Sequence, residues 1–113
     1  MLSVHEGPAS ISKRGIQEIM AGMILSNEPG FYQPGEFGIR QENLVHVIPV
    51  SNDFLGFENL TFVPFDKRLI DKSLLSQTQL DALNSYHREV LTKIRPHLSE
   101  ALQDWFEHKC EAL

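Results

Sequence analysis

Two glutamates, Glu28 and Glu42, have the residue type and spacing of ligands in a hydrolytic metal site. Each lies at the end of a predicted β-strand, and their separation suits two strands joined by a loop of about ten residues. Such a hairpin can place both carboxylates on one face. Hard divalent cations prefer carboxylate oxygens, and an imidazole such as that of His5, upstream of both glutamates, can act on a bound substrate. Because two glutamates are too few to hold a catalytic metal pair, the sequence predicts one part of such a site.

The other reactive or aromatic side chains have simpler interpretations. A lone glutamate or histidine is more often a solvated or structural residue than a ligand. We therefore assign no function to the remaining histidines, which are His46, His87, His97 and His108. Trp105 and Phe106 are predicted to be core or subunit-interface residues, and Cys110 has no predicted role.

The elements that must position the glutamates are predicted to be β-strands. Short apolar runs predict strands over residues 23–27, 39–50 and 57–64. The stretch 29–38 is rich in glycine and proline, which predicts a long hairpin loop or a pair of turns. Residues 1–66 are therefore expected to be β-rich.

The rest of the chain, residues 67–113, has the pattern of a helical extension. Ser76 and Gln79 form a capping-box pattern, which predicts the start of a helix that runs to Ile94. Pro96 ends or kinks that helix, and a second helix is expected from Ser99 to Lys109. The predicted fold class is α+β, with a β-rich part followed by a two-helix tail.

Composition limits the classes of partner. The chain has 113 residues, a net charge of −5 and 42% hydrophobic residues, which is typical of one folded soluble domain. Nucleic acid is an unexpected partner because no basic stripe is present. No apolar run is long enough to cross a bilayer, and the start lacks the pattern of a signal peptide. With one cysteine and no internal disulfide, a reducing, cytoplasmic location is expected.

Three motifs together carry a resemblance to a known family. Residues 4–8 (VHEGP), 22–32 (GMILSNEPGFY) and 36–43 (EFGIRQEN) resemble the C-terminal part of a Xaa-Pro aminopeptidase, or aminopeptidase P. Residues 55–66 and 69–71 are similar to the extension of the larger, three-domain members. The resemblance implies the C-terminal portion of a pita-bread fold, a curved sheet flanked by helices.

The resemblance also implies roles for individual residues. It implies two divalent ions, usually manganese, with zinc or cobalt as alternatives, held by two aspartates, one histidine and two glutamates. Glu28 resembles the ligand of a single metal, and Glu42 resembles the ligand that bridges both. His5 resembles a histidine that contacts the substrate and steadies the transition state, while Tyr32 and Arg40 resemble a hydrogen-bonding relay behind the site.

The resemblance further implies that the two aspartates and the ligand histidine lie upstream of His5. We therefore expect the chain to be a fragment, inactive alone, of a homodimeric hydrolase that releases the N-terminal residue from peptides with proline at position two. Two alternatives stay open, a prolidase acting on dipeptides and a pita-bread module that binds without catalysis. The residues of the motifs, SNEPG at 26–30 and GIRQEN at 38–43, favour the aminopeptidase.

Overall fold

The computed structural model describes residues 9–113, which divide into two compact units, one ending at Thr61 and one running from Phe62 to Leu113. The predicted domain boundary between residues 66 and 67 stays a prediction. In the first unit the strands are β1 (Ile24–Asn27), β2 (Gly30–Gln33), β3 (Phe37–Arg40), β4 (Asn43–Ser51) and β5 (Phe54–Asn59). In the second unit the α-helices are α1 (Gln77–Ile94) and α2 (Glu100–Cys110), with short 3-10 helices at Lys67–Leu69, Lys72–Leu74 and Arg95–His97.

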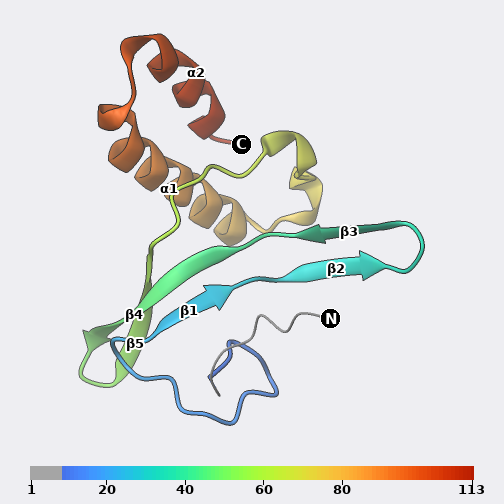
Figure 1. Cartoon of the computed structure of the whole chain (residues 1–113), viewed down its shortest axis with the longest axis vertical. Coiled ribbons are helices and arrows are strands. Elements are labelled where there is room, and N and C mark those ends of the chain that lie inside the picture. The colour runs from blue at the N-terminus through green and yellow to red at the C-terminus, as the bar shows by residue number, and fades with distance from the viewer. Residues whose placement is uncertain (1–8) are drawn as a thin grey trace. The chain divides into compact units, whose positions relative to one another are not determined.

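The first unit is built from two antiparallel sheets. Strands β1, β4 and β5 form one sheet in the order β1-β4-β5, and β2 pairs with β3 in a separate ladder. Figure 1 shows that β2 continues the line of β1 and that β3 leads into β4, so the two ladders form one long hairpin. Among the described residues of this unit only Val45 and Val47 are buried. Most of its large apolar side chains are therefore exposed.

The structure corrects two strand predictions. The stretch 29–38, predicted to be a long hairpin loop or a pair of turns, contains β2 and the first half of β3, and only its tip is a turn, where Gly35 has a φ of 77°. Glycine and proline weaken a strand, but cross-strand hydrogen bonds decide pairing, and here they outweigh local preference. The third predicted strand, over 57–64, is shifted toward the N-terminus, because β5 pairs with β4 over Phe54–Asn59 and residues 60–64 form no strand. The expected strand end at residues 2–5 lies outside the described residues.

Both predicted helices of the second unit are confirmed. Ser76 is the N-cap of α1, and its side chain and that of Gln79 complete the capping box. Pro96 lies in the 3-10 turn between the helices, and α2 follows the N-cap residue Ser99. A buried core made of Tyr86, Val90, Phe106 and Cys110 joins the two helices. No helix within residues 9–113 has the length and apolar character needed to cross a bilayer.

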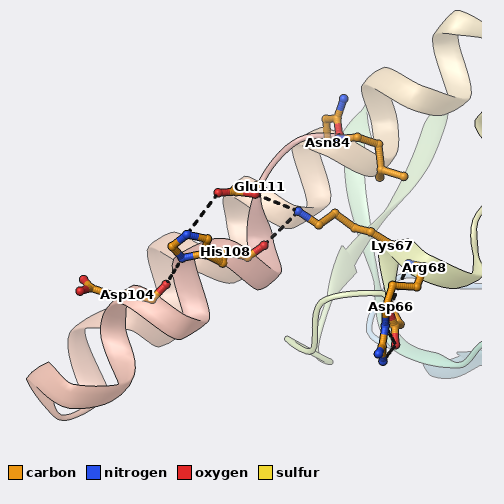
Figure 2. Close-up of polar contacts among 8 residues, drawn as sticks. Asp66, Lys67, Arg68, Asn84, Asp104, His108 and Glu111 are labelled. Carbon is orange, nitrogen blue, oxygen red and sulfur yellow. Dashed lines mark hydrogen bonds and ion pairs between the residues drawn. The ribbon is translucent and has the colours of Figure 1, made fainter.

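Segment 62–69 is attached to both helices of this unit by polar contacts. The hydroxyl of Tyr86 donates to the carbonyl of Val63 at 2.9 Å. Figure 2 shows the Nζ of Lys67 donating to the carbonyl of His108 at 2.9 Å and contacting the Glu111 carboxylate at 3.3 Å. A lysine that caps the carbonyl end of a helix also faces its negative dipole end. These contacts explain why residues 62–66 belong to the helical unit.

His87 makes this unit sensitive to acid. Its ring is fully buried, and its Nε2 accepts a hydrogen bond from the backbone N–H of Phe65 at 3.1 Å. Burial lowers the pKa of His87, the Glu111 carbonyl partly opposes this, and the charge of Lys67 lowers the pKa further. An unfolded histidine takes up a proton near pH 6.5, which the folded ring resists. The contribution of the neutral His87 ring to the free energy of unfolding is therefore fully present above about pH 6.5. It decreases as the pH falls below that value.

We expect the unfolding temperature of the chain to decrease as the pH is lowered from about 7.5 to about 5.5. Most carboxylates titrate only below this range. His87→Gln, which keeps an acceptor, is expected to flatten this dependence, as measured by circular dichroism. His97→Gln is the matched control because His97 is exposed. If His87→Gln keeps the full pH dependence, the acid sensitivity resides in another group.

Candidate functional site

The register of the long hairpin brings the two candidate ligands opposite each other. Asn27 of β1 faces Asn43 of β4, and Gly30 of β2 faces Arg40 of β3. Each side of the hairpin has two residues between these pairs, 28–29 and 41–42, so the register continues without a shift. The backbone N–H of residue 41 donates to the carbonyl of residue 29 at 3.2 Å, which bridges the gap. Positions 28 and 42 therefore lie across from each other, where directly opposed side chains share a face.

Hydrogen bonds connect the side chains on this face. Nη1 of Arg40 contacts Oε2 of Glu28 at 2.5 Å, and Nε of Arg40 donates to the hydroxyl of Tyr32 at 2.7 Å. The Ser26 hydroxyl donates to the other oxygen, Oε1 of Glu28, at 2.9 Å. These residues alternate along the strands, which is the period that places side chains on one side of a sheet. The structure thus assembles Glu28, Tyr32 and Arg40 into one polar cluster.

Arg40 is the positive centre of this cluster. The hydrogen bond from Arg40 to the Tyr32 hydroxyl is the main cause that raises the pKa of the guanidinium, and the carboxylates of Glu28 and Glu42 raise it further. The influence of Glu42 agrees with its position across the hairpin from Glu28. Arg40 thus carries a permanent charge beside both candidate ligands and can orient a carboxylate through its fixed fork of donors.

Two glycines leave room for the ring of Tyr32. A Cβ atom built on Gly38 would lie 2.7 Å from Cδ1 of Tyr32, and one built on Gly30 would lie 2.8 Å from its Cε2. The ring therefore lies over both backbones, and this position brings its hydroxyl to Arg40. The roles of these glycines and of Ser26 were not predicted from the sequence. The available signal was the period of two, since residues 26, 28, 30 and 32 alternate on one strand and 38 and 40 on the other.

The donor set fits part of a metal site. Two opposed carboxylates suit a hard divalent cation, and Arg40 and Ser26 hold one of them in place. Within residues 9–113, no group of three or more histidine, cysteine, aspartate or glutamate side chains could hold a metal ion. His5, the predicted substrate contact, lies outside the described residues. The described residues therefore offer Glu28 and Glu42 as two candidate ligands at opposed positions.

Comparisons with protein families cover almost the whole chain. Residues 1–49 match the model of metallopeptidase family M24, and residues 53–113 match the model of the C-terminal region of peptidase M24. Aminopeptidase P2 of Arabidopsis thaliana is 48% identical over 92% of this chain, which covers 16% of that protein. Xaa-Pro aminopeptidase 1 of Dictyostelium discoideum is 44% identical over 84% of this chain, again covering 16% of that protein.

A solved structure agrees with these relatives. X-prolyl aminopeptidase from Caenorhabditis elegans, described as a cytosolic enzyme with a di-nuclear active site, matches 99% of this chain with a TM-score of 0.83 and 36% identity. The match covers 20% of that enzyme, so the chain spans a fifth or less of the length of each of these three proteins. It confirms the predicted fold class, α+β, with antiparallel sheets and a helix pair from a pita-bread fold. The chain belongs to metallopeptidase family M24, and its residues 53–113 are the C-terminal region typical of that family.

Proposed function

We propose that the complete protein is a Xaa-Pro aminopeptidase, a hydrolase that releases the N-terminal residue from peptides with proline at position two. The observation that carries this proposal is the unshifted register that sets Glu28 opposite Glu42, with Arg40 bonded to Glu28. The names of the similar proteins support the same substrate class. The proposed location is the cytosol, as described for the C. elegans enzyme.

In the proposed site, Glu28 and Glu42 would be two ligands of a larger set that holds two divalent metal ions, with Glu42 a ligand of both. Manganese is the proposed metal, and zinc or cobalt are the alternatives. The ions would supply a Lewis acid and a water molecule activated at neutral pH. Arg40 would orient the carboxylate of Glu28 and Tyr32 would hold Arg40, as their hydrogen bonds indicate. His5 would contact the substrate and steady the transition state.

The test is peptide hydrolysis by the complete, metal-loaded enzyme. We expect cleavage of a Xaa-Pro-Xaa tripeptide and little cleavage of the matched Xaa-Ala-Xaa peptide. Preference for the Xaa-Pro dipeptide would instead identify a prolidase. Binding of proline peptides without any cleavage would identify a non-catalytic module, and either result would overturn the proposal.

The packing of Tyr32 over Gly38 leads to a prediction about the relay. Gly38→Ala forces the ring to move, because the new Cβ lies 2.7 Å from the ring. The Tyr32 hydroxyl then loses its hydrogen bond from Arg40. We expect kcat/KM of the complete enzyme to fall about tenfold, as is usual when the contacts that support a metal ligand are lost. The control is Gly35→Asn in the turn of the same hairpin, where φ is 77° and nothing lies within 4 Å of the added Cβ.

A double variant separates this effect from general damage. If Gly38→Ala acts through the Tyr32 hydroxyl, it will add little further loss to a Tyr32→Phe enzyme. Independent, additive losses in the double variant would show that the glycine acts by another route.

We further propose that the complete enzyme is a homodimer with Trp105 of α2 in its interface. Trp105 is 57% exposed, and Leu102, one helical turn earlier, is 48% exposed. Phe106, predicted together with Trp105 for the interface, lies in the core of its own unit with 7% exposure. Consecutive residues of a helix point about 100° apart, so one of the pair faces inward while the other faces outward.

Trp105→Ala is expected to raise the dimer dissociation constant by at least about 30-fold, as loss of a central interface tryptophan usually does. Sedimentation equilibrium measures this constant. The matched variant is Phe106→Ala, which we expect to lower stability by about 3 kcal/mol through loss of core packing. An unchanged dimer in the Trp105→Ala enzyme would remove α2 from the proposed interface.

A further inference from the structure

Both carboxylate oxygens of Glu28 are held, and by donors of different charge. Oε2 is contacted by the Arg40 guanidinium at 2.5 Å, and Oε1 accepts from the Ser26 hydroxyl at 2.9 Å. We propose that Ser26 is a positioning residue, whose hydroxyl orients Glu28 for a divalent metal ion. This inference rests on the proposed function, since it concerns the same site.

The position of Ser26 in the sheet holds its hydroxyl in place for the hydrogen bond to Glu28. Ser26 lies in β1 and is paired with Leu44 of β4, so its backbone is held by the ladder. Residue 28 lies two positions further on, on the same face of the strand, since side chains alternate with a period of two. Ser26 and Glu28 are both partly buried, which limits competition from water for the hydroxyl. The hydrogen bond therefore connects a strand held in its ladder to Glu28, which lies between the two ladders.

The two donors still leave the carboxylate able to bind a cation. An ionised carboxylate has about four lone-pair sites on its two oxygens. The bonds from Ser26 and Arg40 use one site on each oxygen, so each oxygen retains a site for a metal ion. Because both oxygens are held, the plane of the carboxylate is set before a metal ion arrives. Preorganised ligands bind more tightly because less freedom is lost on binding.

The lack of charge on Ser26 distinguishes its role from that of Arg40. A guanidinium near Glu28 repels an incoming dication while it orients the carboxylate. A hydroxyl orients the carboxylate without adding a positive charge. Ser26 can therefore favour metal binding through position alone, so its loss should weaken metal affinity even with Arg40 in place.

The experiment compares Ser26→Thr with Ser26→Val in the complete enzyme. These two side chains have nearly the same shape, suit a β-strand equally, and differ in the hydroxyl. The enzyme is stripped of metal and titrated with Mn²⁺ alone by isothermal calorimetry. We expect Ser26→Thr to bind Mn²⁺ nearly as tightly as the wild type and Ser26→Val to bind about tenfold more weakly. Ser51→Ala, an exposed serine at the end of β4, is the control for a general effect of removing a serine.

The outcomes separate this inference from the proposed function. If the wild type binds Mn²⁺ and cleaves a Xaa-Pro peptide, but the Thr and Val variants bind Mn²⁺ within about twofold of each other, the role of Ser26 is overturned and the function stands. If the wild type binds no divalent ion, the proposed function itself fails, and the inference fails with it. Should Ser26→Val not fold, Ser26→Ala takes its place against Ser26→Thr, with the same ratio as the criterion.

Discussion

Glu42→Ala in the complete enzyme is expected to lower kcat/KM for a Xaa-Pro peptide by at least about a thousandfold, because a metal centre stabilises transition-state charge by several kcal/mol. The physical reason lies in the proposed position of Glu42, shared between two ions and opposite Glu28 in the hairpin register. Without this carboxylate the site would have less negative charge with which to hold two cations. Activity at saturating Mn²⁺ and the number of ions retained after gel filtration measure the effect, and both should fall.

The matched control is Glu36→Ala at the tip of the same hairpin. Glu36 is exposed and lies in the turn, where its backbone N–H donates to the carbonyl of Gln33. The Glu36→Ala substitution removes the same charge from the same hairpin but leaves the polar cluster around Arg40 unchanged. Activity and metal content should therefore stay within about twofold of the wild type. Equal losses in the two variants would mean that general acidity, and not position, explains the effect of Glu42.

The second large effect concerns the 113-residue chain by itself, which we expect to show no hydrolysis of a Xaa-Pro-Xaa peptide with added manganese. Its described residues offer two opposed carboxylates and no group of three or more ligands for a metal ion. Metal affinity depends on a complete set of ligands, and without it the attacking water is not activated. The chain also spans only 16–20% of the length of the similar enzymes.

This prediction is checked by assaying the purified chain beside the complete enzyme as a positive control. A contaminating peptidase is identified by repeating the assay with the Glu42→Ala chain. Turnover by the chain that disappears in the Glu42→Ala variant would contradict the prediction, because it would show that the fragment builds a working centre.

The helical part of the chain could be predicted from sequence because its determinants are local. The capping box of Ser76 and Gln79 begins α1, and Pro96 lies in the turn after it. Backbone bonds of a helix join residues four apart, so a short window of sequence contains nearly everything that decides where it begins and ends. The side of α2 that faces the core could not be predicted in this way, because Trp105 and Phe106 are both large aromatic residues. Only packing against α1 decides that Phe106 is buried and Trp105 is exposed.

The strands were less predictable, because each depends on a distant partner. The glycines and prolines of 29–38 favour a loop locally, yet β2 and β3 pair across this stretch. The tight turn at Gly35 allows the two strands to meet, with a φ that favours glycine. A local pattern cannot reveal that pairing, since its hydrogen bonds form between residues up to ten positions apart.

For the candidate site, the sequence by itself determined which residues have the right chemistry, namely two glutamates, a tyrosine and an arginine in motifs that resemble one family. Only the tertiary structure decided that positions 28 and 42 lie opposite each other, that Ser26 bonds to Glu28, and that Gly30 and Gly38 make room for the ring of Tyr32. The reason is the register of the hairpin. Because side chains alternate between faces, a slip of one residue would move Glu42 to the other side of the sheet with no change in sequence.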